Sequence, residues 1–142
     1  MMIKLIEKAD LQIWANMCAD VYPDTSAEEM LIEFQEGELP YEYGYYRDEQ
    51  LVGFVSLSIR NDYVEGTSSN PVGYIEGIYV SEPYRKEGIA RELIEFARHW
   101  SIERGCREMA SDCLLENANS LAFHTSVGFK EAERIIHFVM DL

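Results

Sequence analysis

The sequence predicts a mixed α/β fold in one domain that spans residues 1–142. The first observation is the order of the expected elements, which runs strand, two helices, three strands, helix, strand, helix and strand. The second is that each of the last two helices follows a strand, which favours a sheet that is at least partly parallel. The third is size, because 142 residues with 47% apolar content suffice for one hydrophobic core.

The chain is expected to begin with a short strand and two helices. Residues 3–7 alternate weakly between apolar and polar side chains, as in a strand. Asp10 is a candidate N-cap for the first helix, which the Tyr22-Pro23 pair ends. The capping-box sequence Ser26-Ala27-Glu28-Glu29 then begins the second helix, and Gly37 marks its end.

A hairpin and a central strand follow. Residues 41–46 and 51–60 have strand composition, and the polar residues 47–50 between them predict a hairpin turn. Residues 61–70 are rich in Ser, Asn and Gly and predict a surface loop. The run from Tyr74 to Val80 is β-branched and aromatic, which indicates a buried strand.

The last third repeats strand and helix. Apolar side chains at helical spacing from Ile89 to Ser101 predict a long amphipathic helix. Residues 107–113 alternate as a further strand, and residues 117–127 have a helical pattern that Gly128-Phe129 ends. Residues 131–140 predict one or two final strands.

Composition restricts the partners and the compartment. With 26 acidic against 12 basic side chains, the chain should repel nucleic acid and attract cations, although solubility alone would also explain the charge. No apolar run is long enough to span a membrane and no signal peptide is present, so we expect a cytoplasmic protein with no membrane partner. Cys18, Cys106 and Cys113 lack metal-site spacing and are expected to be buried, reduced thiols, so no metal is predicted.

The loop between the central strand and the long helix is the clearest binding motif. It reads R-x-x-G-x-A from Arg85 to Ala90, and it lacks both the Walker GK[ST] and the dinucleotide G-x-G-x-x-G sequences. Gly88 and Ala90 leave the helix N-terminus open, so a pyrophosphate can accept hydrogen bonds from its backbone N–H groups. Arg85 and Lys86 would add positive charge.

Three features together resemble the GCN5-related N-acetyltransferases. They are this loop, the helix sequence Asn117-x-x-Ser120-x-x-x-His124 and the Gly128-Phe129 pair. The resemblance implies a mixed sheet splayed at Tyr74–Val80, with acetyl-CoA lying in the splay. The cofactor contacts that it implies are made by the backbone of the splayed strand, by the loop and by the last helix, at Ile78, Tyr79, Val80, Arg85, Lys86, Glu87, Gly88, Ile89, Ala90 and Asn117.

His124 departs from the family pattern. The family often has a tyrosine four residues before the glycine of the GF pair, where it protonates the departing thiolate, and this chain has His124 there. A histidine is able to donate a proton near neutral pH. The alternative is that the ring is packed on a helix face.

Within the family, the chain resembles the aminoglycoside 6'-N-acetyltransferases. The similar stretches are residues 60–66, 76–78, 105–112 and 128–134. Such enzymes acetylate an amine of a polycationic drug, commonly as homodimers. By position, the resemblance implies an acceptor pocket formed by Tyr22, Tyr63, Glu76, Asp112 and Glu133.

Two acidic side chains are candidates for the chemistry. An ammonium is no nucleophile until a base removes its proton, and Glu76 stands in an otherwise apolar strand where burial would raise its pKa. The alternative is a carboxylate that pairs with an arginine or faces solvent. Asp112 ends a neighbouring strand and either binds ammonium groups or caps a turn.

Three of these pocket residues also have a structural alternative. Tyr22 could belong to the core, Tyr63 could pack within its loop, and Glu133 could be a solvated surface acid. The expected reaction is direct transfer, with the developing oxyanion held by a backbone N–H near Val80. A polyamine, another metabolite or a protein amine is the alternative acceptor, and a silent acyl-CoA-binding module is the alternative to an enzyme.

Overall fold

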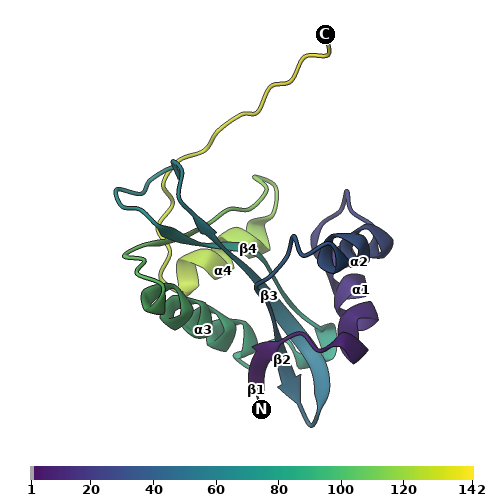
Figure 1. Cartoon of the computed structure of the whole chain (residues 1–142). Helices are drawn as coiled ribbons and strands as arrows, with labels where there is room; N and C mark the ends of the chain where they lie inside the picture. Colours follow the sequence, from purple (N-terminus) through teal and green to yellow (C-terminus); the bar gives the residue numbers. More distant parts are fainter. Residues whose placement is uncertain (1) are drawn as a thin grey trace.

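The computed structural model describes residues 2–142 and contains a five-stranded mixed sheet with helices on both faces (Figure 1). The strand order is β1-β2-β3-β4-β5, antiparallel throughout except for the parallel pair β4–β5. The strands are β1 Met2–Leu5, β2 Glu42–Arg47, β3 Gln50–Arg60, β4 Val72–Val80 and β5 Met109–Ser111. The helices are α1 Leu11–Val21, α2 Ala27–Gln35, α3 Ile89–Glu103 and α4 Ala118–Ser126, with short 3-10 turns at Lys8–Asp10 and Glu82–Tyr84. The predicted mixed α/β class is confirmed.

The helix starts follow the sequence signals in part. The Ser26 hydroxyl accepts a hydrogen bond from the Glu29 N–H at 3.1 Å, which is half of the predicted capping box. Asp10 precedes α1 as expected, but its side chain makes no cap. Its carboxylate instead accepts a hydrogen bond from the Tyr46 hydroxyl at 3.0 Å and so ties the start of α1 to β2.

The turn between β2 and β3 explains the tight hairpin. Asp48 and Glu49 both have left-handed backbone angles, with φ of 49° and 66°. Two consecutive residues of positive φ form the turn whose twist matches that of paired strands. The hairpin therefore holds β2 and β3 in the register that carries the polar row described below.

Each face of the sheet has its own hydrophobic core. Helices α1 and α2 cover one face (Figure 1). In the core beneath them, Trp14 packs edge-on against Phe34 and Phe54. Helix α3 covers the other face with Leu93 and Ala97, both fully buried. Because both faces are covered, an acidic side chain in the middle of a strand must either find partners or point to a break in the sheet.

That break occurs halfway along β4. Strand β5 pairs with β4 only at Gly73, Tyr74 and Ile75, and it ends at Ser111. On the other side of β4, Ser56 faces Gly77 while Leu57 faces Ile75, which leaves Glu76 as the extra residue of a β-bulge. Within residues 2–142, the β5 side of residues 76–80 therefore has no strand partner, as expected for a splayed sheet.

Two expectations are corrected by the fold. Residues 131–140 form no strand, and the end of the chain runs away from the body without regular structure (Figure 1). A strand needs a hydrogen-bonding neighbour, and nothing in residues 2–128 pairs with this segment. Cys113 is exposed rather than buried, because β5 ends before it, whereas Cys18 and Cys106 are buried thiols.

None of the described helices has the length and apolar content of a membrane span.

Candidate active site

The loop from Arg85 to Ala90 leads into the N-terminus of α3. Gly88 has φ of 87°, and a side chain added there would meet no atom within 4 Å. The first backbone N–H bonded within the helix is that of Glu92, which donates to the Gly88 carbonyl at 3.1 Å. The N–H groups that precede it in the first turn are therefore available to an anion.

The side chains of this loop divide between structure and charge. The Arg85 Nε donates to the Val80 carbonyl at 2.7 Å, and its guanidinium lies 5.3 Å from the ring centre of Tyr79. This contact holds one cation where β4 ends. Glu87 forms an ion pair with Arg47 at 3.0 Å, so its carboxylate is drawn towards the β2–β3 hairpin.

These features fit the acetyl-CoA that the family resemblance implies. Residues 78–80 offer the strand edge that β5 leaves open, where an amide-bearing chain can form backbone hydrogen bonds. The start of α3 offers N–H donors, with the exposed cations Arg85 and Lys86 beside them. Ile89 is 1% exposed, so that residue can contribute only its backbone.

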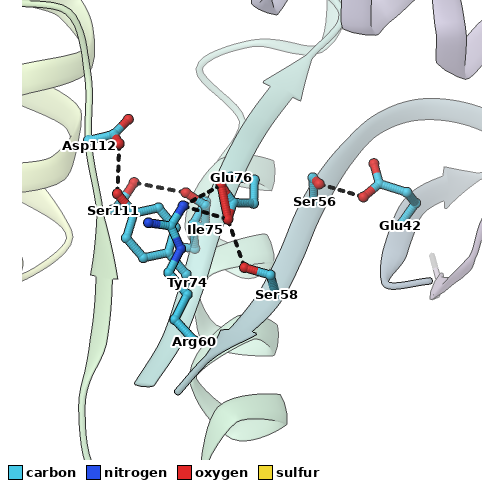
Figure 2. A network of polar contacts seen from close by, with 9 residues as sticks. All are labelled: Glu42, Ser56, Ser58, Arg60, Tyr74, Ile75, Glu76, Ser111 and Asp112. Carbon is cyan, nitrogen blue, oxygen red and sulfur yellow. Dashed lines mark hydrogen bonds and ion pairs between the residues drawn. The ribbon is translucent and has the colours of Figure 1, made fainter. Parts of the chain in front are cut away.

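Glu76 is the centre of a polar network beside the splay (Figure 2). Both of its carboxylate oxygens lie 2.8 Å from Arg60 Nη2, and the Ser58 hydroxyl donates to Oε2 at 2.7 Å. Glu76 is exposed, so the expectation of a buried carboxylate is wrong. The reason is that β5 pairs with β4 only as far as Ile75, so Glu76 stands where the sheet opens.

Asp112 joins the same network through Tyr74 (Figure 2). The Tyr74 hydroxyl donates to Asp112 Oδ2 at 2.7 Å, and the Arg60 guanidinium lies 3.4 Å from the centre of the Tyr74 ring. Burial and the Asp112 carboxylate raise the pKa of Tyr74, so its hydroxyl keeps the proton that it donates. The structure thus brings Glu76 and Asp112, predicted from separate strands, into one site around Arg60.

Tyr22 reaches the site from the side of the sheet that α1 and α2 cover. It follows α1, and its hydroxyl lies against Gly77, where an added Cβ would come within 2.0 Å of the oxygen. Glycine at position 77 therefore makes room for the Tyr22 side chain. The Tyr22 hydroxyl thus contacts β4 one residue from Glu76, and the assignment of Tyr22 to the acceptor pocket stays a prediction.

His124 and Asn117 have partners within the protein. The His124 Nδ1 lies 2.7 Å from the Ser120 carbonyl, which only accepts, so this nitrogen carries a proton. The other ring nitrogen lies 2.8 Å from the Ser111 hydroxyl at the end of β5. The Asn117 side chain accepts from the Ser120 N–H and caps α4. These contacts favour the packed-ring interpretation of His124, and its role as a general acid stays a prediction.

Tyr63 and Glu133 are not brought into the network. Tyr63 is 78% exposed in the 61–70 loop, and Glu133 is exposed in the segment beyond α4. That segment passes the loop at Ala132, which lies against Gly66. The two residues are therefore on neighbouring segments, and their assignment to the acceptor pocket stays a prediction.

Sequence reasoning missed Arg60, which connects both acidic residues. Its signal was an arginine at the end of a strand adjacent to the one carrying Glu76. It also missed Glu42, a buried acid in β2. The signal for Glu42 was a carboxylate within a run of strand residues, which is the same signal that pointed to Glu76.

Comparison with known proteins gives one consistent result. The model of the acetyltransferase (GNAT) family matches residues 9–129. An aminoglycoside N(6')-acetyltransferase type 1 from Stenotrophomonas maltophilia is 35% identical over 142 residues, covering 99% of this chain and 93% of that protein. The corresponding enzyme from Acinetobacter haemolyticus is 35% identical over 140 residues, with 97% of each chain covered.

Solved structures agree with the sequence matches. The aminoglycoside antibiotic 6'-N-acetyltransferase AAC(6')-IG from Acinetobacter haemolyticus has a TM-score of 0.89 at 35% identity, with 100% of this chain and 99% of that chain covered. AAC(6')-Iy, solved with the bisubstrate analogue CoA-S-monomethyl-acetylneamine, has a TM-score of 0.88 at 34% identity, with 99% and 98% covered. The likeness therefore covers the whole site described above.

Proposed function

The chain belongs to the acetyltransferase (GNAT) family, and on that basis we propose that it transfers the acetyl group of acetyl-CoA to the 6'-amine of aminoglycosides. The observation that carries the proposal is the position of Glu76. It lies at the bulge where β5 leaves β4, so a carboxylate adjoins the open strand edge that leads to the loop before α3. Relatives about 35% identical over nearly the whole chain carry the acceptor assignment.

Each part of the site has a role in this reaction. The thioester of acetyl-CoA supplies the activated acetyl group. The backbone of residues 78–80 holds the pantetheine arm, and an N–H near Val80 stabilises the negative charge that develops on the acetyl oxygen. The α3 N-terminus with Arg85 and Lys86 binds the pyrophosphate.

Glu76 and Asp112 recognise and activate the acceptor. Both oxygens of Glu76 are engaged by Arg60, so an incoming ammonium must displace or share this cation. Glu76 then removes the amine proton directly or through a water molecule, and Asp112 binds a further ammonium group. The net charge of −14 draws polycations to the protein.

Thiol release from acetyl-CoA tests the acceptor. Kanamycin and tobramycin are expected to release coenzyme A in proportion to the drug added, while spermidine and lysine peptides at equal concentration release little. Release with spermidine or peptides but not with the drugs would replace the acceptor by another amine. No release with any amine would support a silent acyl-CoA-binding module instead.

The cofactor loop is tested by Arg85→Ala. We expect the KM for acetyl-CoA to rise about 10-fold, because a charge-assisted contact to the pyrophosphate is worth about 1.5–3 kcal/mol. The KM for the acceptor should stay unchanged. Arg98→Ala removes an exposed arginine of α3 that lies outside the loop, and it serves as the control. Equal KM values in Arg85→Ala and wild type would remove Arg85 from the cofactor site.

We also propose a homodimer that acts in the cytoplasm, where acetyl-CoA is available. The segment beyond α4 exposes a row of apolar side chains that no part of residues 2–128 covers: Ile135, Ile136, Phe138, Val139 and Met140, from 53% to 95% exposed. An extended apolar segment of this kind pairs readily with a sheet edge. Strand β5 is such an edge, and a second copy of this chain is the proposed occupant.

Truncation after Lys130 tests the dimer. Light scattering should give a dimer for the full chain and a monomer for the truncated one, since the apolar segment supplies the contact. A full chain with Ile136→Asp and Val139→Asp should also shift towards monomer. Dimers of unchanged stability in both variants would place the interface elsewhere.

A further inference from the structure

The mechanism leaves one buried charged side chain unused. Glu42 of β2 is 2% exposed, and no cation pairs with it among the ion pairs of residues 2–142. Its Oε1 accepts a hydrogen bond from the Trp14 indole N–H at 3.1 Å, and its Oε2 accepts one from the Ser56 hydroxyl (Figure 2). A carboxyl buried on neutral donors alone is costly, which calls for a reason beyond packing.

Its contacts lead directly to the active site. Ser56 faces Glu42 on one neighbouring strand and Gly77 on the other. The Tyr22 hydroxyl lies against Gly77, the residue that Ser56 faces on β4 and one residue from Glu76, so it lies beside the Ser56 hydroxyl. A row of Glu42, Ser56 and Tyr22 therefore crosses the sheet from the buried carboxyl to the acceptor side of the splay.

We propose that Glu42 is a positioning residue for acceptor binding, acting through Ser56 to set the orientation of the Tyr22 hydroxyl beside Glu76. The expected effect on acceptor binding rests on the proposed acetyltransferase function, whereas the effect on the orientation of the Tyr22 hydroxyl does not. When Glu42 is ionised it only accepts, so Ser56 donates to it and accepts from Tyr22. The Tyr22 oxygen then presents its lone pairs to the acceptor's ammonium.

Protonation of Glu42 reverses this arrangement. A protonated Glu42 donates to Ser56, and Ser56 in turn donates to the Tyr22 oxygen. The Tyr22 proton then points towards the acceptor site, where an ammonium needs an acceptor and not a donor. The protonation state of Glu42 thus decides whether the Tyr22 hydroxyl presents a lone pair or a proton to the acceptor site.

The change of state falls in the neutral range. Burial raises the pKa of Glu42 to about 7, against the hydrogen bonds from Ser56 and Trp14, which lower it. The titratable groups that face this region are Cys18 of α1, Glu33 of α2, Tyr22 and Glu76. Burial raises the pKa of both Cys18 and Tyr22, so these two keep their protons while Glu42 titrates.

Carbon-13 NMR of ring-labelled tyrosine tests the row without any assumption about the substrate. The chain has nine tyrosines, and the signal missing from Tyr22→Phe identifies Tyr22. Between pH 5.5 and 8.5 the Tyr22 signal should shift with a midpoint near 7 in wild type, stay flat in Glu42→Gln, and shift much less in Ser56→Ala. Ser101→Ala, which removes another buried serine hydroxyl, should leave the wild-type titration intact.

Kinetics with the aminoglycoside add the functional readout. The acceptor KM of wild type should fall several-fold as the pH rises through 7, with no such fall in Glu42→Gln. In a Tyr22→Phe background, Glu42→Gln should change nothing further. A Tyr22 signal that does not titrate in wild type, or that titrates equally in Glu42→Gln, would overturn the proposal. A titrating signal without aminoglycoside turnover would contradict the proposed function and leave this row standing.

Discussion

Replacing Glu76 by glutamine is expected to lower kcat for acetyl transfer by about 100-fold or more at pH 7. The reason is that the acceptor amine must lose a proton before it attacks, and a positioned base contributes about 10²–10⁴-fold. Glutamine retains the size of the side chain and a carbonyl for Ser58 and Arg60, but it takes up no proton. Steady-state kinetics and acetyl-CoA binding by calorimetry check the prediction, with unchanged cofactor affinity expected.

The control for this variant is Glu103→Gln, which removes an exposed carboxylate at the end of α3. It changes the net charge equally and should leave kcat as in wild type. If Glu76→Gln turned over like Glu103→Gln across a pH series, Glu76 would be only an ion-pair partner of Arg60.

The second large effect concerns stability. Folding raises the pKa of Glu42 from 4.5 to about 7, so the folded protein binds this proton more tightly than the unfolded chain. Between these values the unfolded chain has released a proton that the folded protein retains. The free energy of unfolding therefore falls as the pH rises through this range, by about 3 kcal/mol in total from this one group.

Glutamine at position 42 cannot titrate. The free energy of unfolding of Glu42→Gln should therefore rise relative to that of wild type by about 3 kcal/mol between pH 4.5 and pH 8. Urea unfolding at a fixed protein concentration measures the difference, and Glu103→Gln again provides the reference for a solvated carboxylate. A difference between Glu42→Gln and wild type that is equal at the two pH values would mean that Glu42 titrates alike in both states.

Local signals predicted the elements that depend on neighbours in sequence. Ser26 caps α2, Gly88 starts α3 with a left-handed backbone, and the β2–β3 turn falls where its polar residues stand. These features are decided within a few residues, so one chain is enough to read them. The anion-binding loop belongs to the same class, which is why Arg85 to Ala90 could be located before the fold was known.

Features that depend on strand pairing could not be predicted this way. The exposure of Glu76 follows from the end of β5 pairing at Ile75, and its pairing with Arg60 follows from the register of β3 on β4. Strand composition also suited residues 131–140, but a strand requires a partner that residues 2–128 do not provide. Glu42 was missed because the pattern of β2 does not tell which carboxyl is enclosed by α1 and β3.

Acetyl transfer to a 6'-amine is tested most directly by one pair of substrates. Neomycin and paromomycin differ at the 6' carbon, which carries an amine in the former and a hydroxyl in the latter. With acetyl-CoA, neomycin should gain one acetyl group, located at the 6' nitrogen by NMR, while paromomycin releases no thiol above background. Acetylation of paromomycin at a rate equal to that of neomycin would contradict the claim.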